Sequence, residues 1–217
     1  MSDSSLFVTE IFASIQGETS LAGLMTSFVR LSGCPLRCSW CDSTYTFKQG
    51  TKWTIHALIQ KIEDMGWKHV CITGGEPLIQ PALIPLLNTL EQKGFSLSLE
   101  TGGAYPIDTI PNDVKIILDV KCPASGMSDK NHFQNFSHIK PNDEIKFVIK
   151  DFDDYSWAKE VIAQHNLFAR SNTILFSPVW GILEPHDLVS WICRDQLPVR
   201  FNVQLHKYIW GSEVKGV

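Results

Sequence analysis

Residues 30–42 read RLSGCPLRCSWCD and place three cysteines, Cys34, Cys38 and Cys41, at C-x-x-x-C-x-x-C spacing. The cysteines follow a short apolar run that predicts a β-strand ending at Leu31. Gly33 and Pro35 interrupt regular structure after that run, so we expect the thiols on a loop that leaves the strand. Such a loop can present three thiolates to one centre, but it offers no fourth.

The number of thiols separates two kinds of metal centre. A structural zinc site uses four closed ligands, usually as two separated cysteine pairs. An iron–sulfur cubane with three protein thiolates keeps one iron open for an outside ligand. The spacing therefore favours a [4Fe-4S] cluster, and a non-catalytic zinc-binding scaffold remains the alternative. The scattered cysteines Cys71, Cys122 and Cys193 are interpreted as small hydrophobic side chains rather than ligands.

Length and composition predict one domain over residues 1–217 with a sizeable core. The net charge of −4 argues against a nucleic-acid-binding protein, which normally carries a basic stripe. No apolar run is long enough to span a bilayer, and the first residues lack the basic and apolar regions of a signal peptide. We therefore expect no membrane partner and a cytoplasmic location, where reducing conditions keep thiols free.

Apolar runs and periodicity predict alternating strands and helices. The expected strands are 6–15, 26–31, 68–73, 95–101, 115–120, 144–150, 172–176 and 199–205. The expected helices are 54–65, 81–93, 153–165 and 185–196, the first capped by Thr54 and stopped by Gly66. Residues 124–143 are polar and predict a long loop over one face.

This alternation predicts an α/β fold with a parallel sheet connected by right-handed crossovers. About six βα steps are too few for an eight-fold barrel, so we expect a curved, incomplete parallel β/α barrel with an abbreviated helical layer. Every candidate motif falls at the carboxyl end of a predicted strand, the edge where such barrels carry their active sites. The residues that mark these strand ends are Cys34, Gly74, Glu100, Lys121, Ser177 and His206.

A second motif, Gly74-Gly75-Glu76-Pro77, directly follows a predicted strand. Alone it indicates a tight turn, but its glycines can also expose backbone carbonyls to a ligand. Together with the cysteine spacing it makes the chain resemble the radical S-adenosylmethionine (SAM) enzymes. The resemblance implies that the open iron chelates SAM, that the GGEP motif holds the SAM amino group, and that reductive cleavage yields a 5'-deoxyadenosyl radical.

Three further segments make the chain resemble one family, the 7-carboxy-7-deazaguanine synthases: residues 15–18 (IQGE), 28–30 (FVR) and 41–43 (CDS). The resemblance covers most of the chain, through the late Gln-Leu-His at 204–206. It implies conversion of 6-carboxy-5,6,7,8-tetrahydropterin to 7-carboxy-7-deazaguanine with loss of ammonia, on the route to queuosine and other 7-deazapurines. The alternative within the same superfamily is another small radical SAM enzyme such as a glycyl-radical activase, which would need an open surface for a protein substrate.

The resemblance also implies roles for individual residues. The substrate-binding positions are Gln16, Gly17, Glu18, Arg30, Thr73 and His206. The SAM-binding positions are Gly74, Gly75, Glu76, Glu100, Thr101, Ser177, Pro178, Val179 and Trp180. Asp119 and Lys121 end a strand and either contact the cofactor or serve the fold. The implied partners are a small pterin, an electron donor such as flavodoxin, and a second copy of the chain in a homodimer.

The residue types suit these roles. An amide and a carboxylate fit the donor-rich edge of a pterin, and the arginine fork of Arg30 fits a substrate carboxylate. Ser43 matches a hydroxyl that ligates Mg²⁺, an ion that takes few protein ligands. Ser43 replaces the threonine common in the family, and neighbouring Asp42 is a competing ligand. Thr19 replaces the last glycine of the family's Q-G-E-G.

Overall fold

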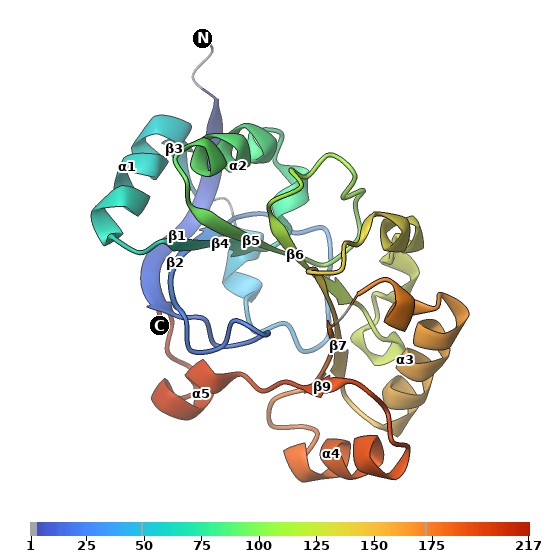
Figure 1. Ribbon diagram of the computed structural model, residues 1–217. Coiled ribbons are helices and arrows are strands. Elements are labelled where there is room, and N and C mark those ends of the chain that lie inside the picture. Colours follow the sequence, from blue (N-terminus) through green and yellow to red (C-terminus); the bar gives the residue numbers. More distant parts are fainter. Residues whose placement is uncertain (1–3, 49, 172) are drawn as a thin grey trace.

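The computed structural model describes residues 4–48, 50–171 and 173–217. A single nine-stranded sheet runs through them in the order β3-β1-β2-β4-β5-β6-β7-β8-β9. The sheet curves around a central space, with β3 and β9 at its two edges, so it forms an incomplete β/α barrel (Figure 1). The predicted fold class is confirmed.

The strands are β1 Ser5–Ile15, β2 Met25–Leu31, β3 Thr51–Thr54, β4 His69–Gly74, β5 Ser96–Thr101, β6 Lys115–Val120, β7 Glu144–Ile149, β8 Thr173–Pro178 and β9 Arg200–Phe201. The α-helices are α1 Ile55–Met65, α2 Leu83–Gln92, α3 Phe152–Gln164, α4 Pro185–Arg194 and α5 Leu205–Trp210. None of these helices is long and apolar enough to cross a membrane.

The sheet is parallel from β2 to β9, as predicted, but its first edge is not. β1 pairs antiparallel with both β2 and β3. The connection from β1 to β2 is too short for a crossover and closes as a hairpin, in which Gln16 N donates to Leu24 O at 2.7 Å. The edge strand β3 was not predicted, because it has only four residues and the first two, Thr51 and Lys52, are polar and exposed.

The helix boundaries follow their local capping signals. Ala57 N donates to Thr54 Oγ1 at 3.2 Å at the start of α1, and Gly66 ends it with φ of 76°. The prediction for α2 was wrong at its start. Pro81 lies before the helix, which begins at Leu83 after Ala82.

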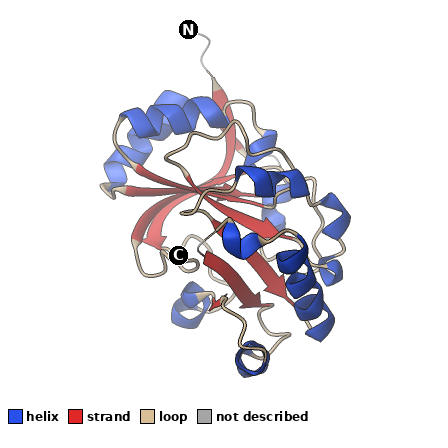
Figure 2. Ribbon diagram, turned by 45° about the vertical axis from the view of Figure 1, so that its right-hand side comes forward, coloured by secondary structure: helices blue, strands red, loops and turns tan. Residues whose placement is uncertain are grey.

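Helices α1 to α4 cover the outer face of the sheet, where the apolar core lies (Figure 2). Between β5 and β7 the described chain forms no α-helix, which confirms the abbreviated helical layer. The predicted loop 124–143 instead contains short 3₁₀ turns, including Ser128–Lys130 and Phe133–His138. Asn135 ties this loop to the preceding one by donating to Tyr105 O at 2.9 Å.

The C-terminal part differs from the prediction. The expected strand 199–205 pairs only at Arg200–Phe201, and α5 follows. Asn202 N still donates to Phe176 O at 2.9 Å, while its side chain accepts from Thr19 N at 2.7 Å and donates to Ser177 Oγ at 2.8 Å, and the chain then turns into α5. His206 therefore lies in the first turn of α5 and not at the end of a strand. The predicted start of the strand 172–176 lies outside the described residues.

Candidate functional site

A cavity of about 600 Å³ lies inside the barrel, at the carboxyl ends of the parallel strands. All the predicted site residues except Glu76 and Thr101 line it. They come from β2, β4, β5, β6 and β8, from the β1–β2 hairpin connection, and from α5. The strand ends that the sequence pattern singled out thus meet at one cavity, and the hairpin connection and α5 also line it.

The loop after β2 presents the three thiols to this cavity. Cys34, Cys38 and Cys41 are free and half-buried. Backbone contacts hold the loop on two sides, with Gly33 N donating to Thr46 O at 2.7 Å and Ser39 N donating to Ser125 O at 3.0 Å. These contacts fix the conformation of the cysteine loop, which forms part of the cavity wall.

Burial raises the pKa of each thiol, and the charge of Lys121 opposes this effect at Cys38 and Cys41. In the described part of the chain, no three His, Cys, Asp or Glu side chains converge on a position that one metal ion could share. A closed zinc site needs such convergence. A cubane binds each thiolate to a different iron, so three separated thiols with one shared opening fit a [4Fe-4S] cluster better.

The two glycines after β4 pack directly against the cysteine loop. Gly74 has φ of 147°, and a Cβ there would lie 2.3 Å from Leu31 O. A Cβ on Gly75 would lie 2.2 Å from Gly33 O. The sequence places glycine here because two backbones touch, and the same contact exposes the strand end to the cavity.

Glu76 and Thr101 lie behind this wall rather than in it. The Glu76 side chain is fully buried and accepts hydrogen bonds from Thr101 Oγ1 at 2.8 Å and Gly102 N at 2.8 Å. Burial raises the pKa of Glu76, although these donors counteract the effect. The pair joins the end of β4 to the end of β5, so it positions residues that do line the cavity.

Glu100 is the centre of a polar group at the end of β5. Its carboxylate accepts from Gln16 Nε2 at 3.1 Å and from Thr73 Oγ1 at 2.9 Å. The structure therefore groups Glu100 with two residues that the family resemblance assigns to the substrate. The sequence had placed it among SAM contacts.

The hairpin connection carries a second carboxylate, Glu18, that forms an ion pair with Lys146 of β7. Burial opposes ionisation of Glu18, but the charge of Lys146 outweighs it and lowers the pKa of Glu18. Gln204 Nε2 also donates to Glu18 Oε1 at 3.1 Å. Glu18 is therefore an anion held in place at neutral pH.

His206 of α5 packs on the hairpin connection at Gly17. A Cβ on Gly17 would lie 2.0 Å from His206 Nδ1, so only glycine permits this approach. Leu205 N donates to Gly17 O at 2.8 Å and keeps the two segments together. Burial lowers the pKa of His206, which favours the neutral imidazole at neutral pH.

Arg30 lies on β2 opposite Glu10 of β1. Its Nε donates to Glu10 Oε1 at 2.7 Å, and the hydroxyl of Tyr45 donates to the same oxygen at 2.9 Å. Burial raises the pKa of Tyr45 to about 12, so this hydroxyl keeps its proton. The side chains of Arg30 and Glu10 are mostly buried and line the cavity, so they do not form an exposed surface ion pair.

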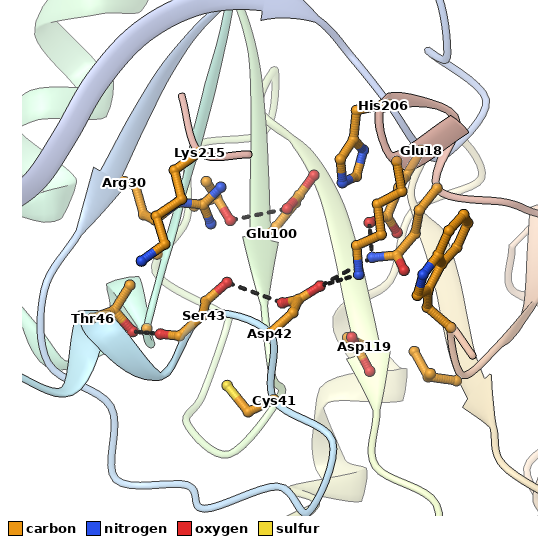
Figure 3. Close-up of a pocket in the computed structure, with 18 of the residues that line it drawn as sticks. Glu18, Arg30, Cys41, Asp42, Ser43, Thr46, Glu100, Asp119, His206 and Lys215 are labelled. Carbon is orange, nitrogen blue, oxygen red and sulfur yellow. Dashed lines mark hydrogen bonds and ion pairs between the residues drawn. The ribbon is translucent and has the colours of Figure 1, made fainter. Parts of the chain in front are cut away.

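Asp42 and Ser43 follow the last cysteine and point across the cavity (Figure 3). Ser43 Oγ donates to Asp42 Oδ1 at 3.0 Å, while Lys207 Nζ donates to Asp42 Oδ2 at 2.7 Å. Burial opposes ionisation of Asp42, but Lys207 outweighs it and holds the pKa of this carboxyl well below its usual range. Both Asp42 oxygens accept hydrogen bonds, whereas no side chain or backbone group among the described residues donates to Ser43 Oγ.

The remaining predicted residues line the opposite wall. Lys121 Nζ lies 3.0 Å from Asp119 Oδ1, at the end of β6. The end of β8 and the residues after it contribute Ser177, Pro178, Val179 and Trp180. Trp180 stacks edge-on against Tyr208 with ring centroids 4.9 Å apart, which ties this wall to α5.

Sequence reasoning missed several cavity residues: Glu10, Tyr45, Lys146, Gln204, Lys207 and Lys215. One of them carried a signal. Lys146 stands inside the apolar strand 144–149, where an unexplained charge on the inner face indicates a buried partner.

Comparisons with known proteins agree with this geometry. The Radical SAM superfamily model matches residues 28–128. A relative from Koribacter versatilis named 7-carboxy-7-deazaguanine synthase is 44% identical, and the match covers 97% of this chain and 99% of the relative. A relative of the same name from Chlorobaculum tepidum is 43% identical over 98% of this chain and 97% of its own.

A solved structure shares the fold. The crystal structure of QueE from Escherichia coli superposes with a TM-score of 0.76 at 24% identity, covering 92% of this chain and 94% of that one. The near full-length relatives carry the assignment, and the structural match supports the architecture. The chain belongs to the 7-carboxy-7-deazaguanine synthase family of the radical SAM superfamily.

Proposed function

We propose that this chain converts 6-carboxy-5,6,7,8-tetrahydropterin to 7-carboxy-7-deazaguanine with loss of ammonia, in 7-deazapurine biosynthesis such as the route to queuosine. One observation carries the proposal. Gln16, Glu18 and Arg30, which the family resemblance assigns to pterin binding, line the same cavity as the loop with the three cysteines. The names of the near full-length relatives support the same reaction.

In this proposal Cys34, Cys38 and Cys41 hold a [4Fe-4S] cluster, and SAM binds between it and the ends of β4, β5 and β8. When bound, the cluster and SAM would supply the radical chemistry, and the protein would hold them with the three thiolates and the strand ends that line the cavity. Gly74 and Gly75 offer backbone atoms to SAM, and Glu76 holds the wall behind them. Residues 177–180 form the opposite side of the SAM site.

The pterin binds deeper, against the hairpin connection. Glu18 is ionised and can accept from the amino and ring N–H groups of a pterin. Gln16 and Thr73 already hold Glu100, so this carboxylate is fixed in orientation before a ligand arrives. Arg30 presents its terminal nitrogens to the substrate carboxylate, since only its Nε is engaged by Glu10.

Ser43 would hold Mg²⁺, an ion that takes few protein ligands, through its hydroxyl oxygen. The support for this role is the direction of one hydrogen bond. Ser43 gives its proton to Asp42, so its lone pairs face the cavity. Asp42 is the weaker candidate as a direct ligand, because Lys207 and Gln204 already occupy its other oxygen.

The remaining parts of the proposal concern the protein's setting. Residues 1–217 act as one domain, for which the single continuous sheet is the support. The three free thiols suit the reducing cytoplasm. Reductive SAM cleavage needs an electron donor, and a flavodoxin is proposed for this role. A homodimer is proposed as the assembly.

The test is anaerobic reconstitution with iron and sulfide, followed by incubation with SAM, a reductant and 6-carboxy-tetrahydropterin. We expect a brown protein that forms 7-carboxy-7-deazaguanine, and ammonia in equal amount. A brown protein that cleaves SAM but leaves the pterin unchanged would refute the proposed substrate. A colourless protein that retains zinc would refute the whole proposal in favour of a scaffold.

A further inference from the structure

The cavity contains five cationic side chains, and four of them are matched by a carboxylate. The pairs are Arg30–Glu10, Lys121–Asp119, Lys146–Glu18 and Lys207–Asp42. The fifth, Lys215, lines the same cavity, and no carboxylate in the described part of the chain forms an ion pair with it. An uncommitted ammonium inside a charged cavity is available to an anionic ligand.

Lys215 is placed by an aromatic contact. Its Nζ lies 4.2 Å from the centroid of the Tyr45 ring, in cation–π geometry. The segment 212–217 follows α5 and lines the cavity mouth. Such a contact at an exposed position is weak, so the ammonium can turn towards an anion without a large loss.

Tyr45 also links Lys215 to Arg30. The Tyr45 hydroxyl and Arg30 Nε share one oxygen of Glu10, at 2.9 and 2.7 Å. Figure 3 shows Lys215 and Arg30 on the same side of the view, above Ser43. The terminal nitrogens of Arg30 donate no hydrogen bond to residues 4–48, 50–171 or 173–217. Arg30 and Lys215 therefore both contact the Glu10–Tyr45 pair, and the terminal nitrogens of Arg30 and the ammonium of Lys215 remain available to one ligand carboxylate.

We propose that Lys215 is a second binding residue for the carboxylate of the substrate, acting beside Arg30. The inference rests on the proposed function, since 6-carboxy-tetrahydropterin is the anion concerned. Arg30 holds the carboxylate by its fork from the sheet, and Lys215 approaches from the cavity mouth. Lys215 contributes to binding and orientation, and it takes no part in proton or hydrogen transfer.

The experiment titrates substrate into cluster-loaded, SAM-bound protein. Lys215→Met keeps the length of the side chain and removes its charge, so we expect the Kd to rise about tenfold, between the effect of an exposed and of a desolvated ion pair. Lys215→Arg should restore most of the affinity. Because the contact is made equally in ground and transition states, kcat should change by less than about twofold while KM rises.

Two controls separate this role from a structural one. Lys52→Met alters an exposed lysine of β3 that does not line the cavity, and it should leave the Kd unchanged. Tetrahydropterin without the 6-carboxylate should bind wild type and Lys215→Met equally. An unchanged Kd in Lys215→Met, or an equal loss with the decarboxylated pterin, would overturn the inference.

The result also separates the inference from the proposed function. If wild type turns over the carboxylated pterin and Lys215→Met binds it equally well, only the role of Lys215 falls. If wild type neither binds nor converts this pterin, the proposed function falls and the inference falls with it.

Discussion

Two ion pairs on the inner face of β7 differ in what surrounds them. At the start of the strand, Glu144 pairs with Lys115 at 2.9 Å and also binds Ser20 of the hairpin connection. Two residues further on, Lys146 pairs with Glu18 of the same connection. Only the second pair lines the cavity.

The difference shows how depth along one strand separates structure from function. Glu144 is completely buried, and its partners come from the protein itself, so this pair closes the barrel at the amino end of β7. Glu18 and Lys146 face an open space of about 600 Å³ and can still interact with a ligand. Burial of a charge therefore does not by itself indicate a functional site. A charge that borders a cavity does.

The largest effect on activity is expected from replacing the three thiols that line the cavity. Cys34→Ala, Cys38→Ala and Cys41→Ala should each abolish reductive SAM cleavage, because a cubane needs all three thiolates. Cleavage is measured as 5'-deoxyadenosine released under anaerobic conditions. Cys193→Ser, on the exposed side of α4, is the matched control and should keep cluster and activity. Equal loss of the cluster in that control would refute the assignment.

Arg30→Ala tests the cavity side without touching the cluster. Losing a buried charged partner costs about 2–5 kcal/mol, or roughly thirty-fold to several thousand-fold in affinity for 6-carboxy-tetrahydropterin. Cluster content and SAM binding should remain. Arg30→Lys should recover only part of the loss, because an ammonium cannot reproduce the fork that bridges Glu10 and a ligand.

The measurement is a titration of the pterin into SAM-bound protein. Wild-type affinity in Arg30→Ala would mean that the carboxylate lies elsewhere in the cavity.

Glu144→Ala tests the closed side. It leaves Lys115 without its partner, so the free energy of unfolding should fall by about 3 kcal/mol. Protein that remains folded should keep its KM for the pterin. Lys93→Met breaks the exposed Lys93–Glu63 pair as a control and should cost less than about 1 kcal/mol. Denaturant unfolding measures both changes, and a raised KM in Glu144→Ala would contradict the division between the two sides.

The smallest effect concerns Mg²⁺. Ser43→Ala should weaken the response of pterin turnover to added Mg²⁺ by several-fold, on the order of 1 kcal/mol, while Ser43→Thr keeps the hydroxyl and the response. Uncoupled SAM cleavage should hardly change, because the ion would contact the substrate and not the cluster. Equal pterin turnover with and without metal in a chelated assay would remove Mg²⁺ from the mechanism.

The fold was largely predictable because its signals are local. Thr54 caps α1 and Gly66 ends it, and both act within a few residues of themselves. The failures came where a distant partner overrode the local signal. Residues 199–205 have the composition of a strand, but Asn202 bonds to Thr19 and Ser177, and the chain turns into α5.

The sequence by itself determined the number and spacing of the thiols, the glycine pair that packs on their loop, and the strand ends at which both occur. These features depend on neighbours along the chain. Only the tertiary structure decided which charges meet: Glu18 with Lys146, Asp42 with Lys207, and Lys215 with Tyr45. Those partners are separated by much of the chain, and curvature of the sheet brings them to one cavity, so no local pattern could indicate them.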